Sequence, residues 1–570
     1  MSLALLLGVG MVQGGFHFSG YSAPAGFLLL GSLFLLSRSL LPLWIGTAFA
    51  ALLARIQPIE GWSDQTFVQF SALASLLSGH GIYDPHSALG VSWSIYLPMA
   101  DLLAAFPIWF LGAKFWVFFQ VGVVAILSLP FFVAPSQTTF RLFLGLVTFA
   151  PFAGLTGKGS ALEVSVAVLV VGFWLLLRER HLSLAAGLLA YGALLRQPLL
   201  FIVPFVGLAL ARLRAWRALL VFSAVLVFGG LVHVLRNPMG FFAAAFGIWA
   251  DFADQWFQMR GRQGNFSISS LLAFFGDSGA ADRARQPFYL VVLALALCGL
   301  AIAAWRGRTT ENAIACAIVA TLLVHVLNRG FVLFHYLAAA AMPAFAFAGW
   351  SKPLARRPLP GEPAASGLEG MLAAGIGSAL LILVVTPLVL AAVGEVRSFR
   401  AAPGPLVEIV SVREGDEDLT PSLRAQMRSA TELGTLELVG AVELDTHKAL
   451  EIGLAYPAQP DELVLRGARI DVREVAGVNL VYPSEREVVG FLRSGRIEGS
   501  ADGRAWHSVG RFRTVIHPSF FPTRIELDTR GEPVRFLRIV DGRTWWGQKE
   551  WMFGGISVHS HLPAAQINQE

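Results

Sequence analysis

The sequence predicts a polytopic α-helical membrane protein with about 11–13 transmembrane helices, followed by a C-terminal extracytoplasmic β-sandwich domain. Three observations predict this fold class. The 570 residues are 55% hydrophobic and only 14% charged, with a mean hydropathy of +0.62. Apolar runs recur up to residue 394, whereas the chain after about residue 400 is polar and holds no run long enough to span a bilayer. Short basic clusters separate the apolar runs, as the positive-inside rule predicts for cytoplasmic loops.

These features divide the chain into a multi-spanning domain over 1–394, a linker with a helical segment over 395–435 and a β-sandwich over 436–570. Taking the basic clusters as cytoplasmic puts residues 57–94, 236–286 and everything after 394 outside. We therefore expect a multi-pass protein of the cytoplasmic (inner or plasma) membrane, with its C-terminal domain in the periplasm or outside the cell. The basic residues do not form a continuous face, so we expect no nucleic-acid partner.

The C-terminal region has the pattern of short strands. Alternating segments occur at 523–529 ("TRIELDT"), 534–540 ("VRFLRIV") and 554–560 ("GGISVHS"). Asp502–Gly503 is a strong signal for the turn of a hairpin. Many short strands with turn residues between them are typical of a β-sandwich.

Asp64 lies at the head of an amphipathic stretch in the first external segment. Apolar residues follow it at near-helical spacing, and the glycines of "SGHG" (78–81) end the stretch. One interpretation is that Asp64 caps this helix and complements its dipole. The other is that Asp64 is the reactive carboxylate of a membrane enzyme.

Cations and polar groups also occur at the ends of later apolar runs. Three cations are expected towards the outer face, namely Lys158, Arg196 and Arg329, and His335 follows shortly after the last of them. Together they would bind a lipid-linked phosphate. The alternative is that they snorkel to the membrane interface. Asn265 and Ser267 in "GNFS" suit sugar hydroxyls, or equally a turn followed by a helix cap.

Taken in order, these segments resemble the polyprenol-phosphate-sugar-dependent glycosyltransferases of the GT-C superfamily, and most closely the mannosyltransferases of glycosyltransferase family 87. The resemblance covers about residues 60–350. It rests on Asp64, "GIYDP" (81–85), "SIYLP" (94–98), "AAGLLAYGALLRQPLLFIVP" (185–204), "GNFSISSLL" (264–272) and "FHYLAAAAMPAF" (334–345). The chain departs from the family at Leu97, at "GKGS" (157–160) in place of a Gly-Gln-x-Asn motif, and at Arg196, where lysine is common.

The resemblance implies that a sugar, mannose or another hexose or pentose, is transferred with inversion from a polyprenyl phosphate to a hydroxyl of a glycan or glycolipid on the extracytoplasmic face. Asp64 would be the general base, and no cofactor or metal is expected. The residues that would bind the donor, its phosphate or the sugars are Tyr83, Asp84, Tyr96, Lys158, Arg196, Asn265, Ser267, Arg329 and His335. A transporter or flippase for lipid-linked saccharides, with an external carbohydrate-binding domain, is the alternative.

The C-terminal segment resembles a discoidin or galactose-binding module. The resemblance rests on "IEGSADGRAWHSVG" (497–510) and on 534–560, which begins with "VRFLRIVDG" and ends with "GGISVHS". Such modules often bind carbohydrate through loops at one end of the sandwich. Trp545, Trp546 and Trp551 would offer stacking surfaces for a sugar, or would be core aromatics. The module would equally serve as a structural cap over the active site.

Overall fold

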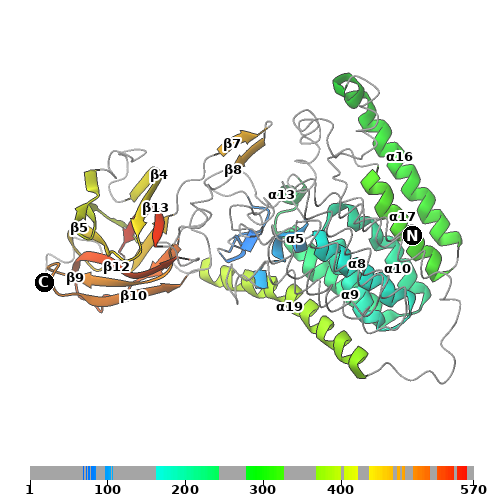
Figure 1. Cartoon of the computed structure of the whole chain (residues 1–570), viewed down its shortest axis with the longest axis horizontal. Helices are drawn as coiled ribbons and strands as arrows, with labels where there is room; N and C mark the ends of the chain where they lie inside the picture. Colours follow the sequence, from blue (N-terminus) through cyan, green and yellow to red (C-terminus); the bar gives the residue numbers. More distant parts are fainter. Residues whose placement is uncertain are drawn as a thin grey trace, which may run out of the picture. The chain divides into compact units, whose positions relative to one another are not determined.

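The computed structural model describes 162–242, most of 278–326, 367–398 and most of 404–560, together with parts of 69–84 and 97–106. Within 404–560 the described ranges are 404–421, 435–466, 472–475, 478–481, 492–513, 523–544 and 549–560. The chain forms two compact units, which we describe separately. The first contains α5 to α17 and most of α19. The second comprises Leu73–His80, Pro107–Lys114 and Leu390–Glu570 and contains all the described strands (Figure 1).

The prediction of about 11–13 transmembrane helices is wrong. Among the described residues, two helices are long and apolar enough to cross a membrane, namely Trp216–Arg236 and Gly370–Glu395. The other apolar helical stretches there, such as Val291–Arg306 within a longer helix, span 10–17 residues. The helices α8 and α9 are almost wholly buried by their neighbours. A helix that is apolar on all sides is typical of a protein core as well as of a bilayer, so the apolar runs alone overstate the number of spans.

The helical unit is built around α8 (Leu162–Leu177) and α9 (Leu182–Ala193), which pack against each other through glycines. A Cβ atom on Gly172 would lie 2.8 Å from Leu189 Cγ, and one on Gly187 would lie 2.7 Å from Leu380 Cδ2 of α19 (Gly367–Ser398). These two glycines therefore set how closely α9 approaches α8 and α19, because any side chain there would push the helices apart.

The first candidate span is a continuous helix with an irregular turn in its middle. It comprises α11 (Trp216–Leu226), the π-helical turn η7 (Val227–Leu231) and α12 (Val232–Arg236). The helix stops at Asn237, whose backbone is not helical, and α13 (Pro238–Phe242) follows. Proline after the break cannot continue the helical hydrogen bonding, which explains the stop.

Three more helices pack beside this group, and Arg212 joins two of them. The helix α10 (Val203–Arg212) follows the 3₁₀ turn η6 (Gln197–Ile202). The Arg212 guanidinium donates to the carbonyls of Thr309 (2.7 Å), Trp305 (3.0 Å) and Ala304, where α16 (Ser278–Arg306) ends and α17 (Thr310–Val326) begins. A cation thus satisfies carbonyls that the end of α16 leaves open.

The segment after Asp64 is helical at its described residues and ends as its glycines predict. Gly79 has a φ of 79°, its N–H donates to Leu76 O (3.1 Å), and the N–H of His80 donates to Ser75 O (2.9 Å). This pair of bonds with a left-handed glycine is the Schellman motif that terminates helices.

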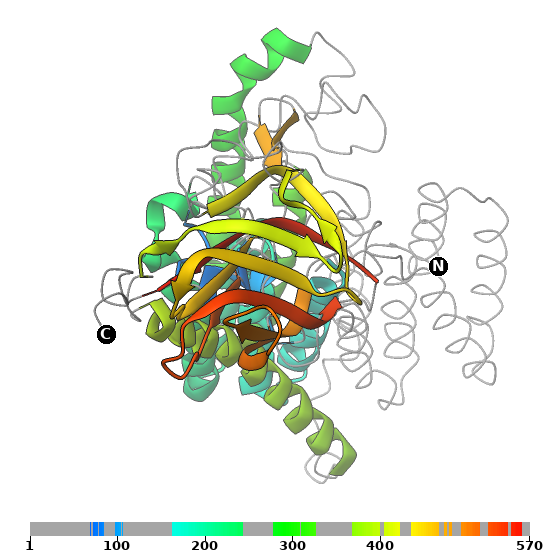
Figure 2. The same ribbon diagram turned by 90° about the vertical axis from the view of Figure 1, so that its left-hand side faces the viewer.

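The second unit contains two antiparallel sheets, as the alternating segments predict. In the first sheet, β13 (Glu550–His559) is the central strand and pairs with β1 (Leu406–Val407), β6 (Glu462–Arg466) and β4 (Thr435–Asp445). Strand β6 also pairs with β11 (Thr523–Glu526). The other has the order β10 (His507–Arg513), β9 (Leu492–Ser500), β12 (Val534–Thr544), β5 (Leu450–Ala458), β2 (Ile409–Glu414), β3 (Glu417–Asp418). Figure 2 turns these strands towards the viewer. A separate pair is formed by β7 (Val472–Val475) and β8 (Val478–Val481).

One buried cluster joins the inner faces of both sheets. Ile556 and Leu463 come from the first sheet, and Ile452, Ile497 and Leu537 come from the second; each has no exposed surface. A shared core between two sheets is the arrangement of a β-sandwich.

The sequence predictions for this unit have two outcomes. The turn at Asp502–Gly503 is confirmed, because β9 and β10 form an antiparallel hairpin around it and Gly503 has a φ of 73°. The segment 395–435 was predicted to be a linker with a helical part, whereas the structure forms strands β1, β2 and β3 within 406–418. Alternation of apolar residues in "LVEIVSVRE" (406–414), rather than its charge, explains why this segment forms strands.

Candidate functional site

The structure describes four of the predicted site residues, Tyr83, Asp84, Arg196 and Trp551. The first three belong to the helical unit and the last to the strand-built unit. The remaining predicted site residues lie outside the described residues: Asp64, Tyr96, Lys158, Asn265, Ser267, Arg329, His335, Trp545 and Trp546.

Asp84 closes a tight turn at the end of the first candidate span. Its Oδ2 accepts from the N–H of Gly81 (2.6 Å), and the N–H of Asp84 donates to Gly81 O (3.1 Å). Asn237 Nδ2 donates to Asp84 Oδ1 (2.9 Å) and to the carbonyl oxygen of Tyr83 (3.3 Å). Both carboxylate oxygens therefore already have a donor within the protein, and the turn is fixed to the end of α12.

Tyr83 inserts its ring into the helical unit beside α13. The side chain is 1% exposed, and its ring meets the Phe241 ring edge-on at a centroid distance of 5.1 Å. Gly240 makes this approach possible, because a Cβ atom there would lie 2.5 Å from Tyr83 O. The N–H of Gly240 donates to Asn237 Oδ1 (2.8 Å), so the same asparagine also holds the start of α13.

A buried acid lies near this tyrosine. Asp101 is in α5 (Pro98–Leu102), directly after the "SIYLP" segment, and has no exposed surface. Burial raises the pKa of the Tyr83 hydroxyl well above its usual value, and the negative charge of Asp101 raises this pKa further. Tyr83 is therefore a neutral hydrogen-bonding group at any physiological pH.

The stretch that follows Asp64 contacts the same helix. Gln69 Nε2 donates to the carbonyl oxygen of Ala100 (2.9 Å), and both residues are buried. The stretch that follows Asp64 and the helix α5 therefore lie in contact, although 31 residues separate Gln69 from Ala100 in the chain.

Arg196 starts the turn η6 and is half-buried. Two residues before it, Leu194 packs against the glycines of η7: a Cβ atom on Gly230 would lie 2.7 Å from Leu194 Cδ2. A Cβ atom on Gly229 would lie 3.4 Å from Met99 Sδ of α5. Through these contacts the segment before Arg196 and the helix α5 both pack against η7, in the middle of the Trp216–Arg236 helix.

Three residues of this site were not found by sequence reasoning: Gln69, Asp101 and Asn237. A fourth buried polar residue, His233, lies one turn before Asn237 in α12. His233 is 1% exposed, and neither of its ring nitrogens has a hydrogen bond within the described part of the chain. Asp101 and His233 are polar residues inside apolar runs, which is a signal for function in a membrane protein. The sequence does not mark Asn237 as a functional residue, because asparagine before proline commonly occurs where a helix ends.

Trp551 is a core residue. It is 5% exposed and belongs to the buried cluster of the sandwich, so its indole ring presents no stacking surface to a sugar. On the outer side of the second sheet, a hollow of about 440 Å³ is lined by arginines of β9 and β10, namely Arg496, Arg511 and Arg513, with Asp541 paired to Arg496 at 3.2 Å.

The helical site offers acids, an amide and a cation, but its described part holds no metal centre. Within the ranges given above, no three His, Cys, Asp or Glu side chains gather in a way that would hold a metal ion. The arrangement provides a rigid polar end to a long apolar helix, with Asp84 half-buried at its surface.

Comparison with known proteins adds no relative: no protein-family model matches the chain, and no curated protein matches its sequence.

Proposed function

We propose that this protein is a membrane-associated glycosyltransferase that moves a sugar from a polyprenyl-phosphate donor to an acceptor hydroxyl, with Asp64 as the general base. One observation carries the proposal. The "GIYDP" turn, the stretch that follows Asp64 and the helix that follows "SIYLP" meet around Tyr83 and α5, at the end of a helix long enough to cross a membrane. These are the segments on which the family resemblance rests.

The surface of this helix supports its placement in lipid. Trp216, Leu220, Leu231 and Leu235 are 63%, 71%, 46% and 63% exposed, and they follow one another at helical spacing. The helix has 21 residues, so its length is about 31 Å, close to the thickness of the hydrocarbon layer. An apolar stripe of this length in water would be a strong aggregation hazard, and in a bilayer it is the expected surface.

The basic residues support an orientation. Arg212, Arg214 and Arg217 lie at the start of the helix, beside the exposed Trp216, and Arg306 lies where α16 ends against Arg212. Basic residues and an interfacial tryptophan are typical of the cytoplasmic side of a span. The Tyr83–Asp84 turn at the other end would then face the extracytoplasmic side.

Chain connectivity limits the distance between Asp64 and the described residue Gln69. Asp64 precedes Gln69 by five residues, so its Cα lies at most about 18 Å from that of Gln69. In the proposed reaction, its carboxylate takes the proton of the acceptor hydroxyl. The hydroxyl oxygen attacks the anomeric carbon from the face opposite the phosphate, which inverts this centre, and the bond to the phosphate oxygen breaks.

The leaving polyprenyl phosphate carries negative charge that needs a cation. We propose Arg196 for this role, with Arg329 as its predicted partner, because a guanidinium binds phosphate oxygens through two parallel hydrogen bonds. For the C-terminal unit we propose carbohydrate binding at Trp545 and Trp546, since burial removes Trp551 from this role.

The test uses full-length protein in membranes with radiolabelled polyprenyl-phosphate mannose, glucose or arabinose. We expect transfer by the wild type and loss of at least a hundredfold in Asp64→Asn, because general-base catalysis contributes about 10²–10⁴-fold. Asp416→Asn, an exposed acid between β2 and β3, is the matched control and should transfer normally. Wild-type rates in Asp64→Asn would refute the base. Movement of the donor across sealed vesicles without any product would favour the transporter instead.

A further inference from the structure

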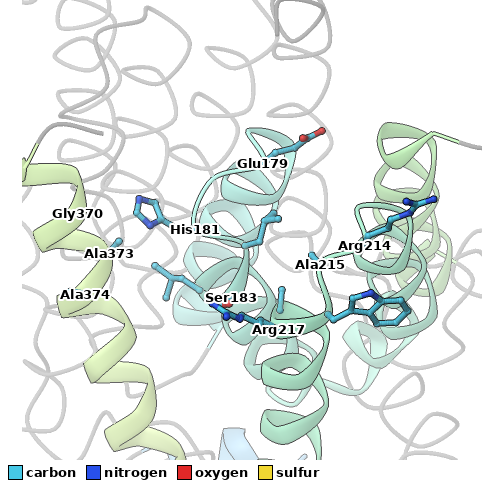
Figure 3. Close-up of a pocket in the computed structure, with 13 residues that line it drawn as sticks. Glu179, His181, Ser183, Arg214, Ala215, Arg217, Gly370, Ala373 and Ala374 are labelled. Carbon is cyan, nitrogen blue, oxygen red and sulfur yellow. The ribbon is translucent and has the colours of Figure 1, made fainter. Parts of the chain in front are cut away.

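A second site lies at the basic end of the helical unit. An open hollow of about 960 Å³ is formed where the α8–α9 loop, the α10–α11 loop and the first turns of α19 come together (Figure 3). Its polar lining consists of Glu179, His181, Ser183, Arg214 and Arg217, and Gly370, Ala373 and Ala374 form the wall on α19. None of these residues belongs to the proposed transfer site.

The cations of this hollow are not neutralised by the protein. Arg214 and Arg217 are exposed, and neither guanidinium makes an ion pair or hydrogen bond with a residue that the structure describes. In Figure 3, Arg217 reaches from α11 towards Ser183 of α9, and His181 is directed towards Gly370 and Ala373. Glu179 is the one acid of the lining and is exposed, so the hollow carries net positive charge.

Two helices of more than two turns begin at the hollow without side-chain caps. The residue before α9 is His181 and the residue before α11 is Ala215, and neither side chain bonds to the first turn of its helix. The first backbone N–H groups of a helix need acceptors and carry partial positive charge. Together with the two guanidinium groups they favour a ligand with several anionic oxygens, as in a phosphate.

The loops hold this lining in an uncommon backbone geometry. Glu179, His181 and Arg214 have φ values of 54°, 47° and 52°, and they are three of the five non-glycine residues with positive φ in the described part of the chain. Side chains rarely tolerate this conformation, so the surrounding packing must impose it. The loops thereby present the lining residues in a fixed arrangement.

Apolar surface adjoins the charged hollow. Trp216 and Leu220 on α11 are exposed, and so is Met371 on α19, which is 72% exposed and follows Gly370 of the wall. A ligand with a phosphate group and a hydrocarbon tail satisfies both surfaces, whereas inorganic phosphate would leave the apolar part uncovered. Basic pockets between membrane helices on the cytoplasmic side are known to bind lipid head groups.

We infer that this hollow binds the phosphate head group of an acidic phospholipid of the adjacent leaflet. Arg217 and Arg214 contact the phosphate oxygens, Ser183 donates its hydroxyl, and the acyl chains lie along Trp216, Leu220 and Met371. The inference rests on the membrane placement given under Proposed function. It is independent of the transfer chemistry, because that chemistry lies at the other end of the Trp216–Arg236 helix.

The test measures binding of tritiated phosphatidylglycerol to the full-length protein in a neutral detergent. Arg214→Gln/Arg217→Gln should bind at least about tenfold more weakly than the wild type, since each cation near an anionic lipid contributes about 1 kcal/mol. Arg306→Gln is the matched control, because Arg306 is an exposed arginine of the same end that does not line the hollow. It should bind as the wild type does.

Three outcomes would overturn the inference. The first is wild-type affinity in the double variant, and the second is an equal loss in Arg306→Gln, which would indicate general surface charge. The third is displacement of the lipid by millimolar inorganic phosphate, which would indicate an anion site without lipid preference. Because all substituted residues are exposed, circular dichroism should show unchanged folding, and transfer activity measured on the same samples separates this site from the catalytic one.

Discussion

Asn237 Nδ2 lies 2.9 Å from Asp84 Oδ1, which joins the end of a long apolar helix to a turn 153 residues earlier in the chain. The amide also donates to Tyr83 O, and its oxygen accepts from the N–H of Gly240. A single side chain thus connects the turn, α12 and α13.

Replacing this asparagine should destabilise the helical unit. In Asn237→Ala, Asp84 loses a charged hydrogen bond and the N–H of Gly240 loses its acceptor, so we expect the free energy of unfolding to fall by about 1–3 kcal/mol. Thermal unfolding of the detergent-solubilised protein measures this. Asn312→Ala removes an exposed bond to Ala303 O (2.7 Å) and should cost less than 1 kcal/mol, roughly the net value of an ordinary hydrogen bond. Equal effects of the two substitutions would contradict the central role of Asn237.

Gly240 should not accept even a methyl group. A Cβ atom there would lie 2.5 Å from Tyr83 O and 2.6 Å from Asn237 Nδ2, so Gly240→Ala should lower stability by about 1–3 kcal/mol through overpacking. Gly207 in α10 has no atom within 4 Å of its Cβ position, and Gly207→Ala should stabilise its helix by about 0.5–1 kcal/mol. Denaturant titration of both variants checks the opposite signs. A stabilised Gly240→Ala would show that the turn does not pack against α13 in solution.

Replacing Trp551 should lower the free energy of unfolding of the sandwich. Trp551→Ala removes a buried indole and should cost about 3–5 kcal/mol, whereas Trp551→Phe should recover part of this loss. Trp506 is partly exposed, with the Arg538 guanidinium 4.2 Å from its ring centroid, and Trp506→Ala should cost only about 0.5–1 kcal/mol for the lost cation–π contact. Chemical unfolding followed by near-ultraviolet circular dichroism measures both. A Trp551→Ala protein that folds normally but loses sugar binding would contradict its core role.

The hairpin of β9 and β10 should lose stability in acid. The N–H groups of Ala505 and Arg504 donate to Asp502 Oδ1 and lower the pKa of this carboxyl, so the charged form is favoured in the folded protein. The contribution is therefore present above the unfolded pKa of about 3.9 and is lost as the pH falls through the lower folded pKa. Asp502→Asn should flatten the decline of the melting temperature below pH 4. Carboxyl NMR titration gives the pKa directly, and an ordinary value for Asp502 would refute the mechanism.

Local signals predicted local structure well. Gly79 ends its helix and Asp502–Gly503 turns its hairpin because the backbone conformation of these residues is set by their own chemistry. The strand at β12 follows from alternation in 534–540, since one face of the sheet is buried and the other is not.

Long-range features could not be predicted in the same way. The number of spans was overestimated because α8 and α9 are apolar for burial against protein, and composition does not distinguish protein from lipid. The contact between Asn237 and Asp84 depends on where two helix ends meet, which no local pattern encodes. Asp101 was hidden inside an apolar run, and its position beside Tyr83 appears only once α5 is folded.

The π-helical turn at Val227–Leu231 has a consequence for tolerance to insertion and deletion. A π turn holds one residue more than an α-helical turn, so it advances the rest of the helix by about 100° relative to a regular helix. The direction in which the side chains of Arg236 and Asn237 point therefore depends on a single additional residue beside Gly229 and Gly230. A lineage that lost this residue would keep a helix of nearly the same length and hydrophobicity, yet its terminal amide would turn away from the aspartate. Length changes by one residue here should consequently be far rarer than substitutions along the same helix.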